Sequence, residues 1–172
     1  GGWGRIKTAV EQLLAAGCEA KDIFQDPSAS PDVFDKMPDD DRKGMQEWVQ
    51  SLRRFGVFFC EPLDLDWAML QAFPAAYKTP EPGTRGPYAT SKKQKDVVLG
   101  EKGNGALYDA SSDELFSWYR YLFSNRSKPA THVRVLSQVS PKDLAKDAPE
   151  ALKALIGYIA KSLSISMPSF GQ

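Results

Sequence analysis

The chain is organised around residues 54–77, which read RFGVFFCEPLDLDWAMLQAFPAAY. The first part, residues 55–60, is the densest apolar and β-favouring run in the sequence. A short apolar run without polar alternation is typical of a strand that is buried on both faces. Apolar residues then take up helical spacing between Trp67 and Tyr77. We therefore expect a strand that leads through an acidic loop into a helix, as at the carboxyl edge of an α/β sheet.

Three acidic residues lie between the expected strand and helix: Glu61, Asp64 and Asp66. Carboxylates at this spacing can converge on a hard divalent cation such as Mg²⁺, which prefers oxygen ligands. Without a cation, clustered carboxylates repel one another. An aspartate directly before a helix is also a common N-cap, so a capping role for Asp64 or Asp66 stands as the alternative.

Lys128 is the second candidate for chemistry, because it lies in a turn at the entrance of a helix. A cation at a helix N-terminus opposes the helix dipole, and a residue placed against local preference indicates another role. A lysine can stabilise the negative charge that develops in phosphodiester cleavage. The alternative is a solvated loop lysine. No Ser/His/Asp or Cys/His triad is evident, and we expect His132 to lie on a helix without a partner, as a packing or surface residue.

Composition restricts the function classes. Lys and Arg number 22 and so do Asp and Glu, so no overall basic field indicates a nucleic-acid partner. The single histidine argues against a His-rich or Cys/His zinc site. Cys18 and Cys60 lie in apolar surroundings, which favours buried thiols over a disulfide. No apolar run reaches the roughly 18 residues of a membrane span and no signal peptide is evident, so we expect a cytoplasmic protein.

Local basic residues remain candidates for contact with DNA phosphates. Arg5 lies at the mouth of a helix that is indicated by an apolar stripe over residues 6–14 and ended by Gly17. The other candidates lie in the Pro-, Gly- and Lys-rich segment 79–95 and in the turn before Pro129: Arg85, Lys92, Lys93, Lys95 and Arg126. Solvated side chains are the alternative for each.

The remaining chain is expected to be helical. The acidic run at 39–41 indicates the start of a helix rather than a metal site. Three helices close the chain, over residues 112–123, from Pro129 to about 139, and from about Pro149 to 163. Ser140 and Pro141 are expected to form a break between the last two.

The same segments resemble the TOPRIM domain of the OLD (overcoming lysogenization defect) family of ATP-dependent endonucleases. Residues 1–17, GGWGRIKTAVEQLLAAG, look like the stretch that follows the family's Asp-x-Asp motif. Residues 56–70, GVFFCEPLDLDWAML, are similar to the family's later strand and acidic motif. Residues 125–132, NRSKPATH, resemble its conserved lysine region.

The resemblance implies an Mg²⁺- or Mn²⁺-dependent DNA endonuclease that uses two metal ions and acts in phage defence or DNA processing. Asp64 and Asp66 match the second acidic motif, with Asp66 where relatives often carry Glu. Lys128 matches the catalytic lysine, and Glu61 has no firm counterpart. The implied partners are DNA, an ATPase domain and a second copy in a homodimer.

The family's first glutamate motif, its Asp-x-Asp motif and the ATPase domain through which ATP would act are expected upstream of Gly1. These 172 residues alone are therefore expected not to cleave DNA.

These expectations combine into an α/β fold, a partial TOPRIM-like parallel sheet flanked by helices, with a predominantly helical C-terminal part. Residues 1–78 would form the back part of the catalytic core, 79–111 a flexible basic loop, and 112–172 the helices that carry Lys128. The competing hypothesis is a non-catalytic helical interaction, dimerisation or DNA-binding module whose acids are helix caps.

Overall fold

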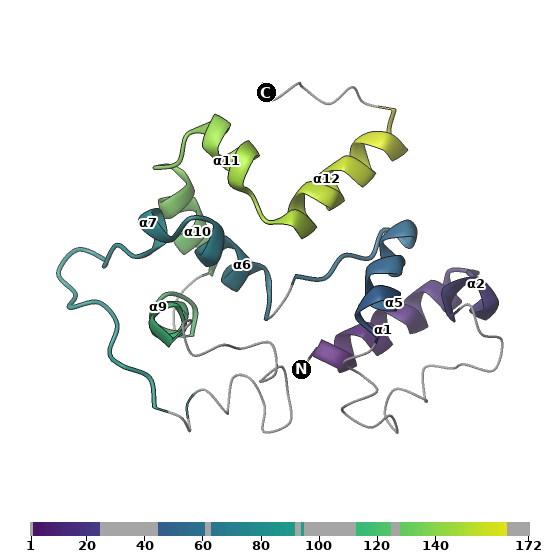
Figure 1. Ribbon diagram of the computed structural model, residues 1–172, viewed down its shortest axis with the longest axis horizontal. Helices are drawn as coiled ribbons and strands as arrows, with labels where there is room; N and C mark the ends of the chain where they lie inside the picture. Colours follow the sequence, from purple (N-terminus) through teal and green to yellow (C-terminus); the bar gives the residue numbers. More distant parts are fainter. Residues whose placement is uncertain are drawn as a thin grey trace. The chain divides into compact units, whose positions relative to one another are not determined.

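The computed structural model describes residues 2–24, 45–60, 63–91, 94, 113–124 and 128–164. All regular secondary structure in these residues is helical (Figure 1), and they contain no β-strand. The expected α/β fold with a partial TOPRIM-like parallel sheet is therefore wrong for the described part of the chain. The chain divides into two compact units, Gly1–Phe59 and Cys60–Gln172, and each has its own cluster of buried apolar side chains.

Residues 55–60 do not form the expected buried strand. Leu52–Phe55 are a 3₁₀ helix, η1, that ends where Gly56 takes the left-handed conformation with φ 79°. Residues 57–60 have no regular structure and are half-buried. Phe55, Val57 and Phe59 pack against the buried cluster of the first unit. The apolar run packs on helices instead of pairing in a sheet. Residues with high β-propensity can do this because that propensity mainly reflects how well side chains fit a packed surface, and not a fixed backbone preference.

The first unit is built from α1 (Gly2–Ala15), α2 (Ala20–Phe24), α5 (Gln46–Ser51) and η1. The predicted apolar stripe on α1 is confirmed, since Ile6 and Val10 are buried. Gly17 ends the helix as predicted, with φ 92°. The backbone N–H groups of Gly17 and Cys18 bond back to the last turn of α1, which is a Schellman motif. The acidic run at 39–41 lies outside the described residues.

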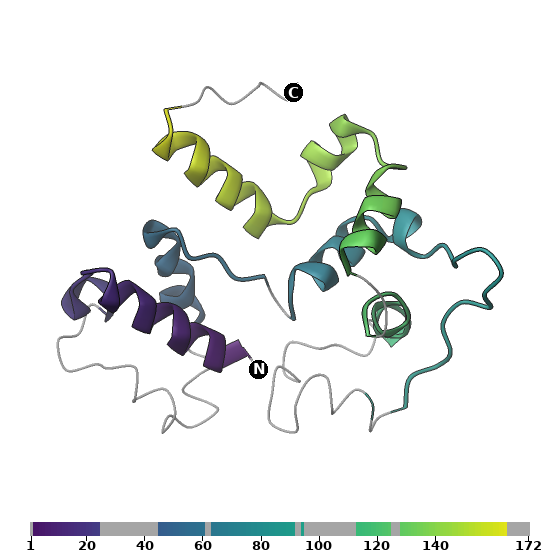
Figure 2. The same cartoon turned by 180° about the vertical axis from the view of Figure 1, so that it is seen from behind.

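The second unit is a cluster of helices in which both α6 and α10 pack against α9 (Figures 1 and 2). Its helices are α6 (Leu65–Ala72), α7 (Pro74–Tyr77), α9 (Asp113–Phe123), α10 (Lys128–Leu136), α11 (Pro141–Asp147) and α12 (Glu150–Ser162). The core is largely aromatic, and its fully buried members include Trp67, Tyr77 and Phe116. Burial of a large apolar side chain contributes about 1.5–3 kcal/mol, so these residues fix how α6, α7 and α9 pack.

Two helix boundaries in the second unit differ from the expected ones. The single helix expected over Trp67–Tyr77 is two helices, because Pro74 lacks a backbone N–H and begins α7. Ser140 and Pro141, expected as a break, begin α11, where the backbone N–H of Asp143 donates to the Ser140 hydroxyl at 3.1 Å. The helix predicted over residues 112–123 is confirmed as α9.

Candidate functional site

Asp64, Asp66 and Lys128 lie together in the second unit. Both aspartates belong to the start of α6, and Lys128 is the first residue of α10. The ammonium group of Lys128 donates to Asp66 Oδ2, although 62 positions separate the two residues. It also lies 3.7 Å from Asp64 Oδ2. The fold thus brings together the predicted catalytic lysine and two of the three predicted metal ligands.

Asp64 is the N-cap of α6, the alternative that the sequence left open. Its Oδ1 accepts a hydrogen bond from the backbone N–H of Trp67 at 3.0 Å. Its Oδ2 accepts a hydrogen bond from the Tyr119 hydroxyl at 2.8 Å and faces Lys128. Capping therefore occupies Oδ1 of Asp64 and leaves Oδ2 beside Lys128.

Asp66 is a buried residue, 8% exposed over the whole residue, and both of its carboxylate oxygens are hydrogen-bonded. Oδ2 accepts from Lys128, and Oδ1 lies 2.8 Å from His132 Nε2. Burial alone would raise the pKa of this carboxyl, but the hydrogen bonds from His132 and Lys128 outweigh burial and hold its pKa below the ordinary value. The hydrogen bond to Asp66 in turn raises the pKa of Lys128. Both groups are therefore charged at neutral pH.

His132 connects Asp66 to the aromatic core, and its role was missed in the sequence. Its Nδ1 lies 2.5 Å from the Tyr77 hydroxyl, and its ring stacks on Phe123 with centroids 5.2 Å apart. His132 is helical and packs as expected, but the expectation that it lacks a partner is wrong. The available signal was the spacing from Lys128, since residues four apart share one face of a helix. Only the packing of α6 and α7 supplies the partners.

The other predicted site residues lie elsewhere. Arg5 is exposed on α1 of the first unit. Arg85 is exposed in the segment 79–91, which the Tyr121 hydroxyl holds by accepting from the backbone N–H of Glu81 at 3.0 Å. The remaining predicted residues lie outside the described residues: Glu61, Lys92, Lys93, Lys95 and Arg126.

The two aspartates have the chemistry of a hard-cation site. Mg²⁺ is commonly bound through one or two carboxylates, with waters and substrate phosphate oxygens as the other ligands. Asp64 Oδ2 and Asp66 Oδ2 fit this pattern, and they converge on the Lys128 ammonium. No group of three or more His, Cys, Asp or Glu suited to a metal occurs among the residues that the structure describes. Because Lys128 already contacts both acids, a divalent ion bound by them would compete with the lysine.

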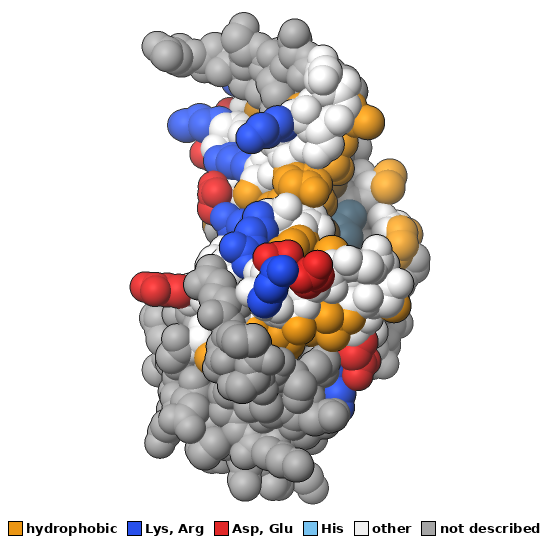
Figure 3. All heavy atoms as spheres, turned by 90° about the vertical axis from the view of Figure 1, so that its right-hand side faces the viewer, with side chains coloured by type: hydrophobic (Ala, Val, Ile, Leu, Met, Phe, Trp, Pro, Cys, Tyr) orange, Lys and Arg blue, Asp and Glu red, His pale blue; other side chains and the backbone are white. Residues whose placement is uncertain are grey.

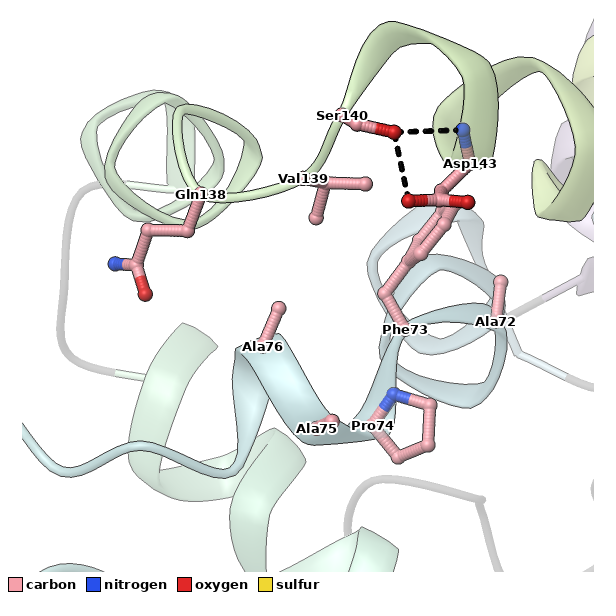
Figure 4. A pocket seen from close by; sticks show the side chains of 9 residues that line it. All are labelled: Ala72, Phe73, Pro74, Ala75, Ala76, Gln138, Val139, Ser140 and Asp143. Carbon is pink, nitrogen blue, oxygen red and sulfur yellow. Dashed lines mark hydrogen bonds between the residues drawn. The ribbon is translucent and has the colours of Figure 1, made fainter.

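A separate hollow of about 440 Å³ lies between α7 and the turn from α10 to α11 (Figure 4). Its lining is mostly small and apolar: Ala72, Phe73, Pro74, Ala75, Ala76 and Val139. Two polar groups in it bond to each other, since the Ser140 hydroxyl donates to Asp143 Oδ2 at 2.6 Å. The hollow therefore supports acid–base or ionic chemistry less well than the cluster around Asp66.

Charged side chains of both signs are mixed with apolar ones on the face drawn in Figure 3. This agrees with the equal numbers of basic and acidic residues in the whole sequence, 22 of each. Contact with DNA would therefore depend on individual basic side chains rather than on the field of the whole molecule.

Comparisons with protein-family models, with curated proteins and with solved structures found no match. The resemblance to the OLD family stays a prediction that rests on the quoted residues. Among the described helices, none is both long enough and apolar enough to cross a membrane.

Proposed function

We propose that the second unit carries part of the nuclease centre of a divalent-metal-dependent DNA endonuclease. Asp64 and Asp66 are the proposed metal ligands, and Lys128 is the proposed stabiliser of developing negative charge. The supporting observation is that Lys128 forms an ion pair with Asp66 across 62 positions of sequence. The spacing of the acids and the position of the lysine at a helix entrance are two separate features of the sequence, and each predicted its residues independently.

Burial gives the acids and the lysine different roles in this proposal. The side chain of Asp66 is 12% exposed and that of Lys128 is 47% exposed. Asp66 is thus a fixed, ionised carboxylate that can act as a metal ligand, whereas the side chain of Lys128 can move toward a phosphate oxygen. When bound, a divalent ion would stabilise charge on the phosphate and activate water. Two carboxylates and water ligands can hold one divalent ion, and the second ion of a two-metal centre would need further ligands from elsewhere in the protein.

Titration with Mn²⁺, followed by electron paramagnetic resonance, tests the proposal. Asp64→Asn keeps the cap of α6, because Asn caps as well as Asp, and replaces the charged Oδ2 that faces Lys128 and accepts from Tyr119 by a neutral amide group. We expect this variant to remain folded and to bind Mn²⁺ about tenfold or more weakly than wild type.

Ser140→Ala is the matched control, because it removes the cap of α11. It is expected to lower the free energy of unfolding by about 1 kcal/mol and to leave Mn²⁺ affinity unchanged. Failure of the wild-type chain to bind Mn²⁺, or equal binding by Asp64→Asn, would refute the metal site.

The competing function is a non-catalytic helical interaction module, and α12 supports it. Ile156 and Ile159 on this helix are 44% and 45% exposed, and Leu163, its C-cap residue, is 64% exposed. In that case Asp64 acts only as a cap. Sedimentation of Ile156→Glu and Ile159→Glu variants tests the module. A self-associating wild type with monomeric variants, together with absent Mn²⁺ binding, would favour it over the nuclease centre.

A further inference from the structure

We propose that Tyr77 and His132 are positioning residues that fix the orientation of the Asp66 carboxylate, so that its Oδ2 faces Lys128. The hydrogen-bonded chain stands on its own geometry, and its relevance to catalysis rests on the proposed nuclease function.

Tyr77, His132 and Asp66 form a continuous hydrogen-bonded path from the aromatic core of the second unit to Lys128. The Tyr77 hydroxyl lies 2.5 Å from His132 Nδ1, and His132 Nε2 lies 2.8 Å from Asp66 Oδ1. Tyr77 is 0% exposed, and the side chains of His132 and Asp66 are 20% and 12% exposed. Water therefore has little access to these hydrogen bonds.

The direction of the hydrogen bonds follows from the acceptor at the end of the path. An ionised carboxylate can only accept, so His132 Nε2 must carry a proton and donate to Asp66. In a neutral imidazole the other nitrogen then accepts, and its donor is the Tyr77 hydroxyl. Burial raises the pKa of Tyr77, so this hydroxyl keeps its proton. The network thus selects the tautomer of His132 with the proton on Nε2.

Aromatic packing holds the two positioning residues in place. The rings of Tyr77 and Phe123 lie 6.1 Å apart, and those of Phe123 and His132 lie 5.2 Å apart. His132 occupies Asp66 Oδ1, which prevents the carboxylate from rotating and leaves Oδ2 to Lys128. Hydrogen bonds to a carboxylate that binds metal orient it in this way, and their loss typically weakens metal binding about 10- to 100-fold.

The single histidine in the sequence makes a spectroscopic test direct, since every imidazole signal of the full chain belongs to His132 when no histidine tag is used. We expect ¹⁵N-histidine NMR of the neutral imidazole to show a protonated Nε2 and an unprotonated Nδ1. Tyr77→Phe should shift the Nδ1 resonance.

Tyr121→Phe removes a hydroxyl of the same unit that bonds the Glu81 backbone, and it should leave both imidazole resonances unchanged. An unprotonated Nε2 in the wild type, or an Nδ1 resonance indifferent to Tyr77→Phe, would overturn the proposal.

Rescue by a conservative variant separates positioning from simple packing. His132→Gln retains an N–H that can donate to Asp66, whereas His132→Leu does not. We expect His132→Leu to weaken Mn²⁺ binding about 10- to 100-fold and His132→Gln to restore most of that loss.

Wild-type affinity in His132→Leu would overturn the positioning role and leave the nuclease proposal standing. Absence of Mn²⁺ binding by the wild type would refute the nuclease proposal, while the imidazole resonances would still decide the positioning role.

Discussion

Asp66 and Lys128 differ in how firmly the surrounding residues hold them. Asp66 is fixed by hydrogen bonds to both oxygens, while the side chain of Lys128 is about half exposed at 47%. The lysine is therefore the partner that a cation or a phosphate would displace. Removal of the lysine is therefore expected to strengthen cation binding, whereas removal of the aspartate is expected to weaken it.

Lys128→Met should tighten Mn²⁺ binding, because the ammonium repels a cation at the same carboxylates. Two unit charges 4 Å apart near a protein surface interact by about 4 kcal/mol, and solvent screening of the exposed lysine reduces this value. We expect affinity to rise about tenfold, which corresponds to about 1.4 kcal/mol. Lys142→Met, a change at an exposed lysine on α11, is the control and should have no effect. Weaker Mn²⁺ binding by Lys128→Met would contradict competition between lysine and metal.

The pKa shifts of the pair predict how the free energy of unfolding depends on pH. The pKa of Asp66 is lowered, so its stabilisation is complete above about pH 3.9 and is lost as the pH falls through the lower folded-state value. The pKa of Lys128 is raised, so its stabilisation is complete below about pH 10.4 and is lost as the pH rises through the higher folded-state value.

Urea unfolding of wild type and Asp66→Asn across this range provides the measurement. The difference in unfolding free energy should shrink as the pH falls below about 4 and as it rises above about 10. The part that depends on pH should be about 1 kcal/mol, because the lysine is half exposed. A difference that does not vary with pH would show that the ion pair does not contribute.

At the scale of elements, α9 organises the second unit, since both α6 and α10 pack on it. The starts of α6 and α10 supply the acids and the lysine, and α7 supplies the Tyr77 hydroxyl. The break at Pro74 makes α7 a separate helix. The site is therefore assembled from three short helices whose relative positions depend on one packed core.

Leu122→Ala on α9 should lower the free energy of unfolding by about 3 kcal/mol, because this side chain is 0% exposed and its loss leaves a cavity. Leu163→Ala is the matched control at a leucine that is 64% exposed, and it should change stability by less than about 0.5 kcal/mol. Chemical denaturation measures both. Equal effects would show that the core is not centred on α9.

At the scale of the molecule, the chain has two compact units, Gly1–Phe59 and Cys60–Gln172, with separate buried clusters. Leu52, 0% exposed, belongs to the first cluster, and its replacement by alanine should cost that unit about 3 kcal/mol. Hydrogen exchange should become faster in α1 and α5, while the His132 resonances of the second unit stay unchanged. Equal acceleration of exchange in both units would show instead that they unfold together.

Local patterns in the sequence determined several elements. The apolar stripe and Gly17 predicted α1, and the aromatic spacing after residue 112 predicted α9, because helical periodicity and capping act within a few residues. The helix expected from about Pro149 is α12, but the exposed Ile156 and Ile159 show that its stripe is not simply a core face.

Tertiary structure decided what the run at 55–60 does and what surrounds Asp66. The run had the composition of a strand, yet a strand needs a pairing partner, and these residues cover helices instead. The sequence selected Asp64, Asp66 and Lys128 as candidates, and only the packing of α6, α7 and α10 placed them beside His132 and Tyr77. Contacts across more than 50 residues depend on the core that forms between the helices, and no local pattern encodes them.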